Sequence, residues 1–177
     1  GNSIEYTYYP QGNLSELKRK PQAGSTDPDI VTSFTYEPRF NFIKTSKDPQ
    51  GNTTTYYYDY EETDLGDLNG DGVTTEDKGN LVKISYPAVG GQTSETKFTY
   101  NAYGQVATVT DPNANVSKYE YDPSTGYLTK TIQAQGALNI TTEMAYDAAG
   151  NVKSIKDPKG NTTAFEYDSH NNLTKTI

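Results

Sequence analysis

The sequence has no cysteine and no tryptophan, and it contains one histidine and one methionine among its 177 residues. The absence of cysteine excludes disulfides and thiolate metal sites. The single histidine, His170, has no accompanying nucleophile and orienting group with which to assemble a catalytic triad. We therefore expect a protein that is not an enzyme, and we interpret His170 as a solvent-exposed turn residue.

Long apolar runs and clusters of basic residues are also lacking. Leu, Ile, Val and Phe make up 16% of the chain, a fraction low enough to raise intrinsic disorder as an alternative. No apolar run approaches the roughly 18 residues that span a bilayer, so we expect no membrane insertion. The net charge is −8 and the basic residues are scattered, with residues 18–20 as their densest group. This distribution argues against nucleic-acid binding.

Tyrosine is abundant instead, and its spacing is regular. Seven of the 16 tyrosines are separated by 28, 22, 42, 21, 25 and 21 residues. A unit of about 21 residues with insertions accounts for every interval, and disorder would not produce such spacing. These repeat tyrosines are Tyr8, Tyr36, Tyr58, Tyr100, Tyr121, Tyr146 and Tyr167.

Each unit contains two turn motifs separated by short runs rich in Thr, Val, Ile, Tyr and Phe. One motif is Tyr-Asp-x-x-Gly-Asn, as in Tyr146 to Asn151, and the other is Asp-Pro-x-Gly-Asn, as in Asp157 to Asn161. The runs between them have 5 to 7 residues, which is typical of strands. The pattern predicts an all-β fold of repetitive antiparallel β-hairpins, about 21 residues each, in an extended, curved or spiralling sheet.

The strand that ends at each repeat tyrosine carries two further columns. Two residues before the tyrosine stands a large side chain, and four residues before it stands Ile4 or a Thr or Ser. A spacing of two places these residues on one face of a strand, where they can form cross-strand pairs. The large residues are Tyr6, Phe34, Tyr56, Phe98, Tyr119, Met144 and Phe165.

The other strand of each unit is less regular. Its apolar pairs are three residues apart in Val106/Val109 and Val152/Ile155 but four apart in Leu128/Ile132. A flat strand would place the first two pairs on opposite faces and the third on one face. Either a β-bulge or burial on both faces would reconcile these spacings.

The two turn motifs in constant order resemble the YD repeats of the Rhs (rearrangement hot spot) family. Similar repeats occur in bacterial polymorphic toxins, wall-associated proteins, toxin-complex C components and animal teneurins. The resemblance covers essentially the whole chain as one array over residues 1–177. It implies a spiralling β-sheet that forms part of a shell or stalk, with neighbouring repeats as partners and, where a toxin is present, an enclosed toxin domain. A secreted or cell-surface location in a bacterium is implied as well.

Several positions depart from the repeat pattern. Phe40, Ala114 and Asn171 stand where other repeats have the turn glycine. Asn tolerates a left-handed backbone and Ala does so poorly, so we expect the turn at Ala114 to differ from the others. Both ends of the chain fall inside a repeat, and we expect a fragment of a larger protein.

The 42-residue interval contains an insertion over residues 61–79 that interrupts one turn. It includes Asp-x-Asn-x-Asp-Gly, the beginning of an EF-hand or dockerin-like calcium loop. Calcium prefers 6 to 8 oxygen ligands. We predict a structural calcium ion, and the alternative is an acidic turn without metal. The candidate ligands are Asp67, Asn69, Asp71, the Val73 carbonyl and a closing acid, with Asp77 favoured over Glu76 because Lys78 occupies the usual last position.

Titration of the chain with Ca²⁺ tests this site. We expect heat release and a rise in melting temperature at millimolar calcium or below, because ion binding stabilises only the folded loop. The Asp71→Ala variant should lose both responses, since one anionic ligand disappears. Unchanged heat and melting temperature in the unsubstituted chain would refute the calcium prediction.

The remaining tyrosines leave a second function open. Tyr9, Tyr57, Tyr60, Tyr103 and Tyr127 lie outside the column and could stack on sugar rings, as in a carbohydrate- or receptor-binding adhesin. A hydrolase would need converging acids, whereas most acids here occupy repeat turns. Six Asn-x-Ser/Thr sequences are explained by turn chemistry without glycans. We therefore expect a structural segment and keep the adhesin as the alternative.

Overall fold

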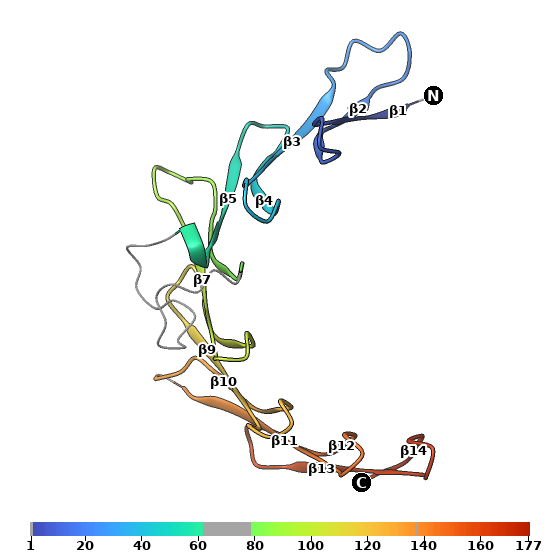
Figure 1. Cartoon of the computed structure of the whole chain (residues 1–177), viewed down its shortest axis with the longest axis vertical. Coiled ribbons are helices and arrows are strands. Elements are labelled where there is room, and N and C mark those ends of the chain that lie inside the picture. The colour runs from blue at the N-terminus through green and yellow to red at the C-terminus, as the bar shows by residue number, and fades with distance from the viewer. Residues whose placement is uncertain (1, 62–78, 137) are drawn as a thin grey trace. The chain divides into compact units, whose positions relative to one another are not determined.

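The structure is a computed structural model that describes residues 2–61, 79–136 and 138–177 (Figure 1). The described residues form fourteen β-strands and one 3₁₀ helix, η1 (Asp59–Glu61). None of their helices is long and apolar enough to cross a membrane. The all-β prediction is confirmed, and the constant alternation of strands and turn residues is its cause.

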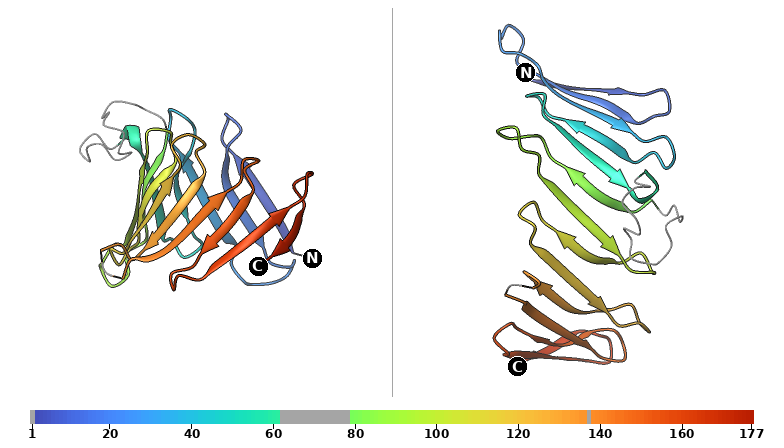
Figure 2. Two further views of the ribbon diagram at one scale, coloured as in Figure 1. Left: turned by 90° about the horizontal axis from the view of Figure 1, so that it is seen from below. Right: turned by 90° about the vertical axis from the view of Figure 1, so that its left-hand side faces the viewer.

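The chain divides into two compact units, residues 1–96 and 97–177, with the boundary inside β7 (Glu95–Tyr100). Consecutive strands pair in antiparallel fashion within each unit (Figure 2). Unit 1 contains β1 (Ser3–Tyr8), β2 (Leu14–Lys20), β3 (Ile30–Tyr36), β4 (Ile43–Lys47), β5 (Thr53–Tyr58) and β6 (Leu81–Ser85). Unit 2 contains β8 (Val106–Thr110), β9 (Val116–Tyr121), β10 (Leu128–Gln133), β11 (Ile140–Tyr146), β12 (Val152–Lys156), β13 (Thr162–Tyr167) and β14 (Leu173–Thr176).

A β-bulge accompanies every repeat tyrosine. Tyr100 pairs with Val106, whereas the preceding Thr99 pairs with Thr108, so one residue of β8 has no partner. The same shift occurs at Tyr8, Tyr36, Tyr58, Tyr121, Tyr146 and Tyr167. The bulge therefore resolves the ambiguity in the other strand.

Because of the bulge, apolar residues three apart share a face. Val106 and Val109 stand opposite Tyr100 and Phe98, which are two residues apart on β7. The bulge places apolar residues four apart on opposite faces. Leu128 pairs with Tyr121 of β9, whereas Ile132 pairs with Lys118, which points to the other face. Leu128 and Ile132 therefore lie on opposite faces, whereas a flat strand would place them on one face.

The two faces of the sheet differ in chemistry. We call the face that carries the repeat tyrosines the tyrosine face and the opposite one the polar face. Among strand residues with assigned cross-strand partners, Arg19 is the single charged side chain on the tyrosine face. The six ion pairs found among the described residues all lie on the polar face. Among them are Lys20–Glu5 at 2.6 Å and Lys118–Glu120 at 2.9 Å.

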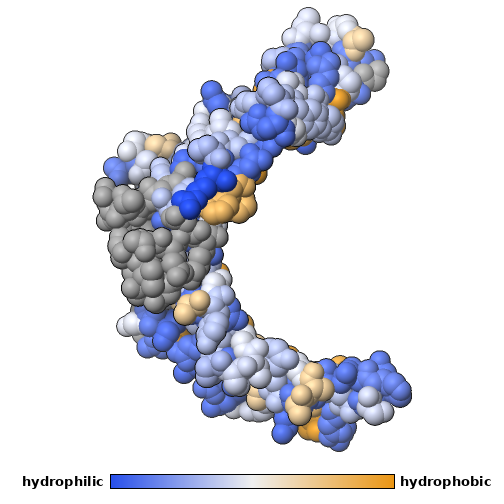
Figure 3. Space-filling view, viewed as in Figure 1, coloured by the Kyte–Doolittle hydropathy of each residue, from blue (hydrophilic) through white to orange (hydrophobic). Residues whose placement is uncertain are grey.

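Few side chains are fully buried, because the described strands form no second layer over either face. Among the described residues, Tyr58, Val82 and Glu37 are buried, and most other strand residues are half-buried. Much of the surface visible in Figure 3 is hydrophilic, with small hydrophobic patches between. Cross-strand pairs and turns must therefore supply much of the stability that a packed core provides elsewhere.

Candidate functional site

The turn at Asp147 shows how each hairpin is closed. The Asp147 N–H donates to the Asn151 carbonyl at 2.9 Å, and the Gly150 N–H donates to the Asp147 carbonyl at 3.1 Å. The carboxylate accepts three further bonds, from the N–H groups of Ala149 and Asn151 at 2.9 Å each and from Asn151 Nδ2 at 3.0 Å. Gly150 has a φ of 90°, which an L-residue rarely adopts. One carboxylate thus fixes the whole turn.

Both sequence motifs adopt this one geometry. The carboxylates of Asp48, Asp111, Asp157 and Asp168 accept the same three bonds from the residues two and four places later. In the turn at Asn101, the side-chain amide oxygen replaces the carboxylate and accepts from Tyr103 and Gln105 at 3.0 Å each. The tyrosine-linked and proline-containing turns therefore have equivalent hydrogen bonds and lie at opposite ends of the strands.

These hydrogen bonds stabilise the ionised carboxylates. The side-chain amide of the following Asn, together with backbone N–H groups, holds the pKa of the carboxyls of Asp48, Asp111, Asp147, Asp157 and Asp168 below its usual range. In the longer turn from Asp122 to Tyr127, the Ser124 hydroxyl and the N–H groups of Ser124 and Thr125 lower the pKa of Asp122 to about 2.

The turn at Ala114 corrects one expectation. Ala114 has a φ of 64°, and its N–H donates to the Asp111 carbonyl at 2.9 Å, as a glycine does in the other turns. The expectation of a different turn is wrong, because the Asp111 and Asn115 bonds impose the left-handed backbone on alanine.

Relieving this strain gives a direct test. The Ala114→Gly variant should be more stable by about 0.5–1 kcal/mol, because glycine adopts positive φ without steric cost but loses more entropy on folding. Thermal unfolding followed by circular dichroism should show a rise of about 2 °C in melting temperature. Ala164→Gly in the middle of β13 is the control and should lower it. A lower melting temperature for Ala114→Gly would mean that the turn is not strained.

Asparagine at the glycine position does more than tolerate positive φ. Asn41 and Asn171 both have a φ of 64°. Asn41 exchanges two hydrogen bonds with Asn13 of the preceding turn, at 2.8 and 2.9 Å, and Asn171 Oδ1 accepts from Asn151 Nδ2 at 2.9 Å. In the second repeat, Asn41 and not Phe40 takes the glycine role. Asparagine therefore joins turns that are 20 or more residues apart in the sequence.

The repeat tyrosines join successive hairpins through their hydroxyls. Tyr58, Tyr121 and Tyr167 donate to the carbonyls of Ile43, Val106 and Val152, each 15 residues earlier, at 2.8–3.0 Å. Tyr36 and Tyr146 reach Leu14 and Leu128 in the same way. Each accepting residue begins a strand at its bulge, so the column of rings also connects adjacent hairpins. These five tyrosines thus stabilise the sheet.

The other tyrosines do not form a common platform. Tyr9 donates to the Phe34 carbonyl, Lys44 and Lys83 lie over the Tyr57 ring, and Tyr127 packs 4.9 Å from Tyr146. Tyr60 packs against Phe40, and Tyr103 is 77% exposed at a turn. His170 lies in an exposed turn, as expected, and its N–H donates to Asp168.

The predicted calcium ligands lie outside the described residues. Asp67, Asn69, Asp71, Val73, Glu76 and Asp77 all belong to the segment 62–78. Within the part of the chain that the structure describes, three or more His, Cys, Asp or Glu side chains do not cluster as metal ligands would.

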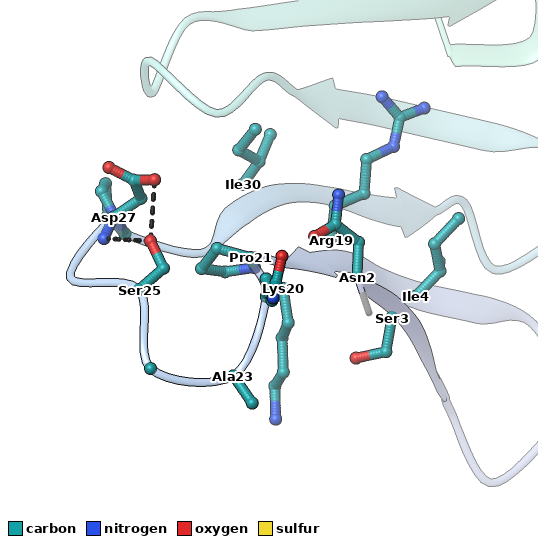
Figure 4. Close-up of a pocket in the computed structure, with 13 residues that line it drawn as sticks. Asn2, Ser3, Ile4, Arg19, Lys20, Pro21, Ala23, Ser25, Asp27 and Ile30 are labelled. Carbon is teal, nitrogen blue, oxygen red and sulfur yellow. Dashed lines mark hydrogen bonds between the residues drawn. The ribbon is translucent and has the colours of Figure 1, made fainter.

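The described residues also line two open surface depressions. One of ≈ 1050 Å³ lies between the loop 21–29 and the ends of β1 and β2 (Figure 4). Ser25 and Asp27 of that loop hydrogen-bond each other, and Lys20 is paired with Glu5. The second, of ≈ 430 Å³, lies on the polar face beside Lys130, Glu143 and Lys156.

Part of the chain matches a known repeat family. The sequence model of the RHS Repeat family matches residues 100–138 and 146–177. The fold is similar to that in a crystal structure of TcdB2-TccC3-Cdc42, with a TM-score of 0.73 and 17% identity over 99% of this chain. A structure of the Photorhabdus luminescens Tc holotoxin pore gives the same values. This chain spans 9% of the length of each of those chains. No curated protein sequence matches.

Proposed function

Because residues 100–138 and 146–177 match the RHS Repeat family, we propose that the whole chain is an RHS-repeat (YD-repeat) array and a structural, non-catalytic wall segment of a larger secreted or surface bacterial protein. The observation that supports this role is the two-faced sheet. Its tyrosine face carries almost no charge, whereas its polar face carries the ion pairs. Such a sheet separates two environments of different polarity, which is what a shell requires.

Toxin encapsulation is the finer form of this proposal. One of the two similar structures is that of a Tc holotoxin pore, and in both a segment like this one is a small part of a much longer chain. We propose that further repeats of the same polypeptide continue the sheet and that its enclosed partner is a toxin domain. Delivery of that domain in competition between cells would be the biological role.

Electron microscopy and proteolysis of the natural full-length protein test this proposal. We expect a hollow particle in which a segment outside the repeats resists protease until the particle is denatured. A solid or extended particle with every non-repeat segment equally sensitive to protease would refute encapsulation. The repeats could then still serve as a stalk, which the extended particle would reveal.

A glycan array distinguishes the wall from an adhesin. We expect the 177-residue chain to bind no glycan selectively, because Tyr9, Tyr57, Tyr60 and Tyr127 are engaged within the fold. Selective binding that is lost in Tyr103→Ala, the variant of the exposed tyrosine, would favour the adhesin instead.

A further inference from the structure

The turn from Glu37 to Phe42 differs from every five-residue turn described above. It has glutamate in place of aspartate, one additional residue and two phenylalanines. The Phe40 and Phe42 rings stack 5.7 Å apart, and both are about two-fifths exposed. Rings on a turn take no part in the cross-strand columns, so the two phenylalanines of this turn must have another role.

The explanation lies in the next tyrosine-linked turn, which carries the insertion. Phe40 packs edge-on against Tyr60 at 5.3 Å, and Phe42 lies 5.2 Å from Tyr58. Tyr58 and Tyr60 stack 6.1 Å apart, and the Arg39 guanidinium lies over both Phe40 and Tyr60. Tyr60 stands two residues before the segment 62–78. Side chains of the turn 37–42 therefore contact the chain immediately before the inserted segment.

The same two rings contact the chain where the insertion ends. Gly79 is the first residue after the segment, and its φ is 77°. A Cβ atom at Gly79 would lie 2.9 Å from Phe42 Cε2 and 3.4 Å from Phe40 Cδ2. The glycine backbone thus rests directly against both rings. Both ends of the insertion are held by one preceding turn.

The interrupted turn is nevertheless closed like the others. The Asp59 N–H donates to the Asn80 carbonyl at 2.9 Å, as Asp147 does to Asn151. The Asp59 carboxylate accepts from the N–H groups of Gly79 and Asn80 at 3.0 and 3.1 Å. Removing residues 62–78 would join Asp59-Tyr60-Glu61 to Gly79-Asn80, which restores Asp-x-x-Gly-Asn.

We infer that residues 37–42 form an anchor for the two ends of the inserted segment and that the β5–β6 hairpin closes without residues 62–78. The Phe40 and Phe42 rings of the anchor contact Tyr60 and Tyr58 before the inserted segment and Gly79 after it. This inference is independent of the proposed wall function.

Deletion of residues 62–78 tests the second half of the inference. The variant should fold with unchanged far-ultraviolet circular dichroism in its β region and a melting temperature equal to or slightly above that of the full chain. Loop closure is entropically cheaper when 17 residues are removed, although the gain grows only with the logarithm of length. Loss of the folded signal, or a melting temperature lowered by roughly 10 °C or more, would show that the sheet depends on the segment.

Trypsin cleavage after Lys78 tests the anchor itself, with cleavage after Lys159 in an exposed turn as the internal reference. In the full chain, Phe42→Ala should raise the Lys78:Lys159 cleavage ratio by up to roughly tenfold, because it removes ring contacts with Gly79. Phe34→Ala is the control, since it removes a half-buried ring of the same unit. Equal ratios in the two variants, whether raised or unchanged, would overturn the anchor.

Discussion

Replacement of Glu37 by glutamine is expected to destabilise unit 1 by about 3 kcal/mol, because the buried carboxylate accepts bonds from three backbone N–H groups. Arg39 donates at 2.6 Å, Phe42 at 2.7 Å, and Phe40 to both oxygens at 2.9 and 3.1 Å. Glu37 is 2% exposed, so water cannot replace a lost acceptor. In the glutamine variant, an NH₂ group replaces one carboxylate oxygen, so that a donor faces a backbone N–H that has lost its acceptor.

The pKa of Glu37 reflects the same arrangement. Burial by itself would raise this pKa, but the Tyr60 hydroxyl and the N–H groups of Phe42, Phe40 and Arg39 lower it to about 2. The hydrogen bonds therefore outweigh the desolvation of the carboxylate. The charge is an essential part of the turn, and a neutral side chain of equal length does not replace it.

Thermal unfolding of the variants measures the effect. Glu37→Gln should lower the melting temperature of unit 1 by about 12–24 °C. Glu16→Gln is the matched control: it removes a carboxylate of the polar face that is paired with Lys18 across 3.3 Å, and it should cost less than about 1 kcal/mol. Similar melting temperatures for the two variants would mean that the Glu37 turn contributes no more than a surface ion pair.

Acidification should destabilise both units together, because many turns share the same carboxylate geometry. The pKa of Glu37 and that of Asp122 are lowered to about 2, and the carboxyls of Asp48, Asp111, Asp147, Asp157 and Asp168 also have a lowered pKa. Aspartate in an unfolded chain has a pKa of about 3.9. The unfolded state therefore binds protons first as the pH falls.

The sign of the effect follows from this difference. Above about pH 5 both states are ionised, and the stabilisation by turn hydrogen bonds is fully present. As the pH falls from about 5 toward 2, the unfolded state takes up more protons, so the free energy of unfolding decreases. We expect the melting temperature to be constant from about pH 7 to 5 and then to fall steeply. A constant melting temperature down to pH 2.5 would contradict the role of the carboxylates.

A double variant isolates one turn in this titration. Asp157→Asn with Asn161→Gln copies the pairing of Asn101 with Gln105, in which the Asn101 Nδ2 donates to Gln105 Oε1 at 3.0 Å. The copied turn keeps acceptors for its backbone N–H groups but has no carboxylate. Its melting temperature should therefore fall less between pH 5 and 2.5 than that of the unsubstituted chain.

The candidate calcium site was predictable as a motif and no further. The motif from Asp67 onward supplies carboxylate and amide oxygens at alternate positions, and that pattern needs no tertiary structure to be recognised. Which acid closes the loop depends on the path of the backbone, which spacing does not fix. The calcium titration and the choice between Asp77 and Glu76 therefore remain predictions.

The sequence alone determined the all-β class, the repeat length and the positions of the turns. These are local properties: Asp, Asn and Gly bias the backbone within four or five residues, and a period of two places Tyr146 and Met144 on one face. The same local reasoning left the spacing of Val106 and Val109 unexplained and led to a wrong expectation at Ala114. Both depend on bonds to a partner strand or to the far end of a turn.

Only the tertiary structure decided how neighbouring hairpins are joined. The hydroxyl bond from Tyr58 to Ile43, the amide pair of Asn13 and Asn41, and the contact of Phe42 with Gly79 each join residues 15 to 37 positions apart. Their geometry is set by the bulges and by the register of strands that lie between them. Local propensity cannot encode such contacts, because the same tyrosine or asparagine would suit an isolated hairpin equally well.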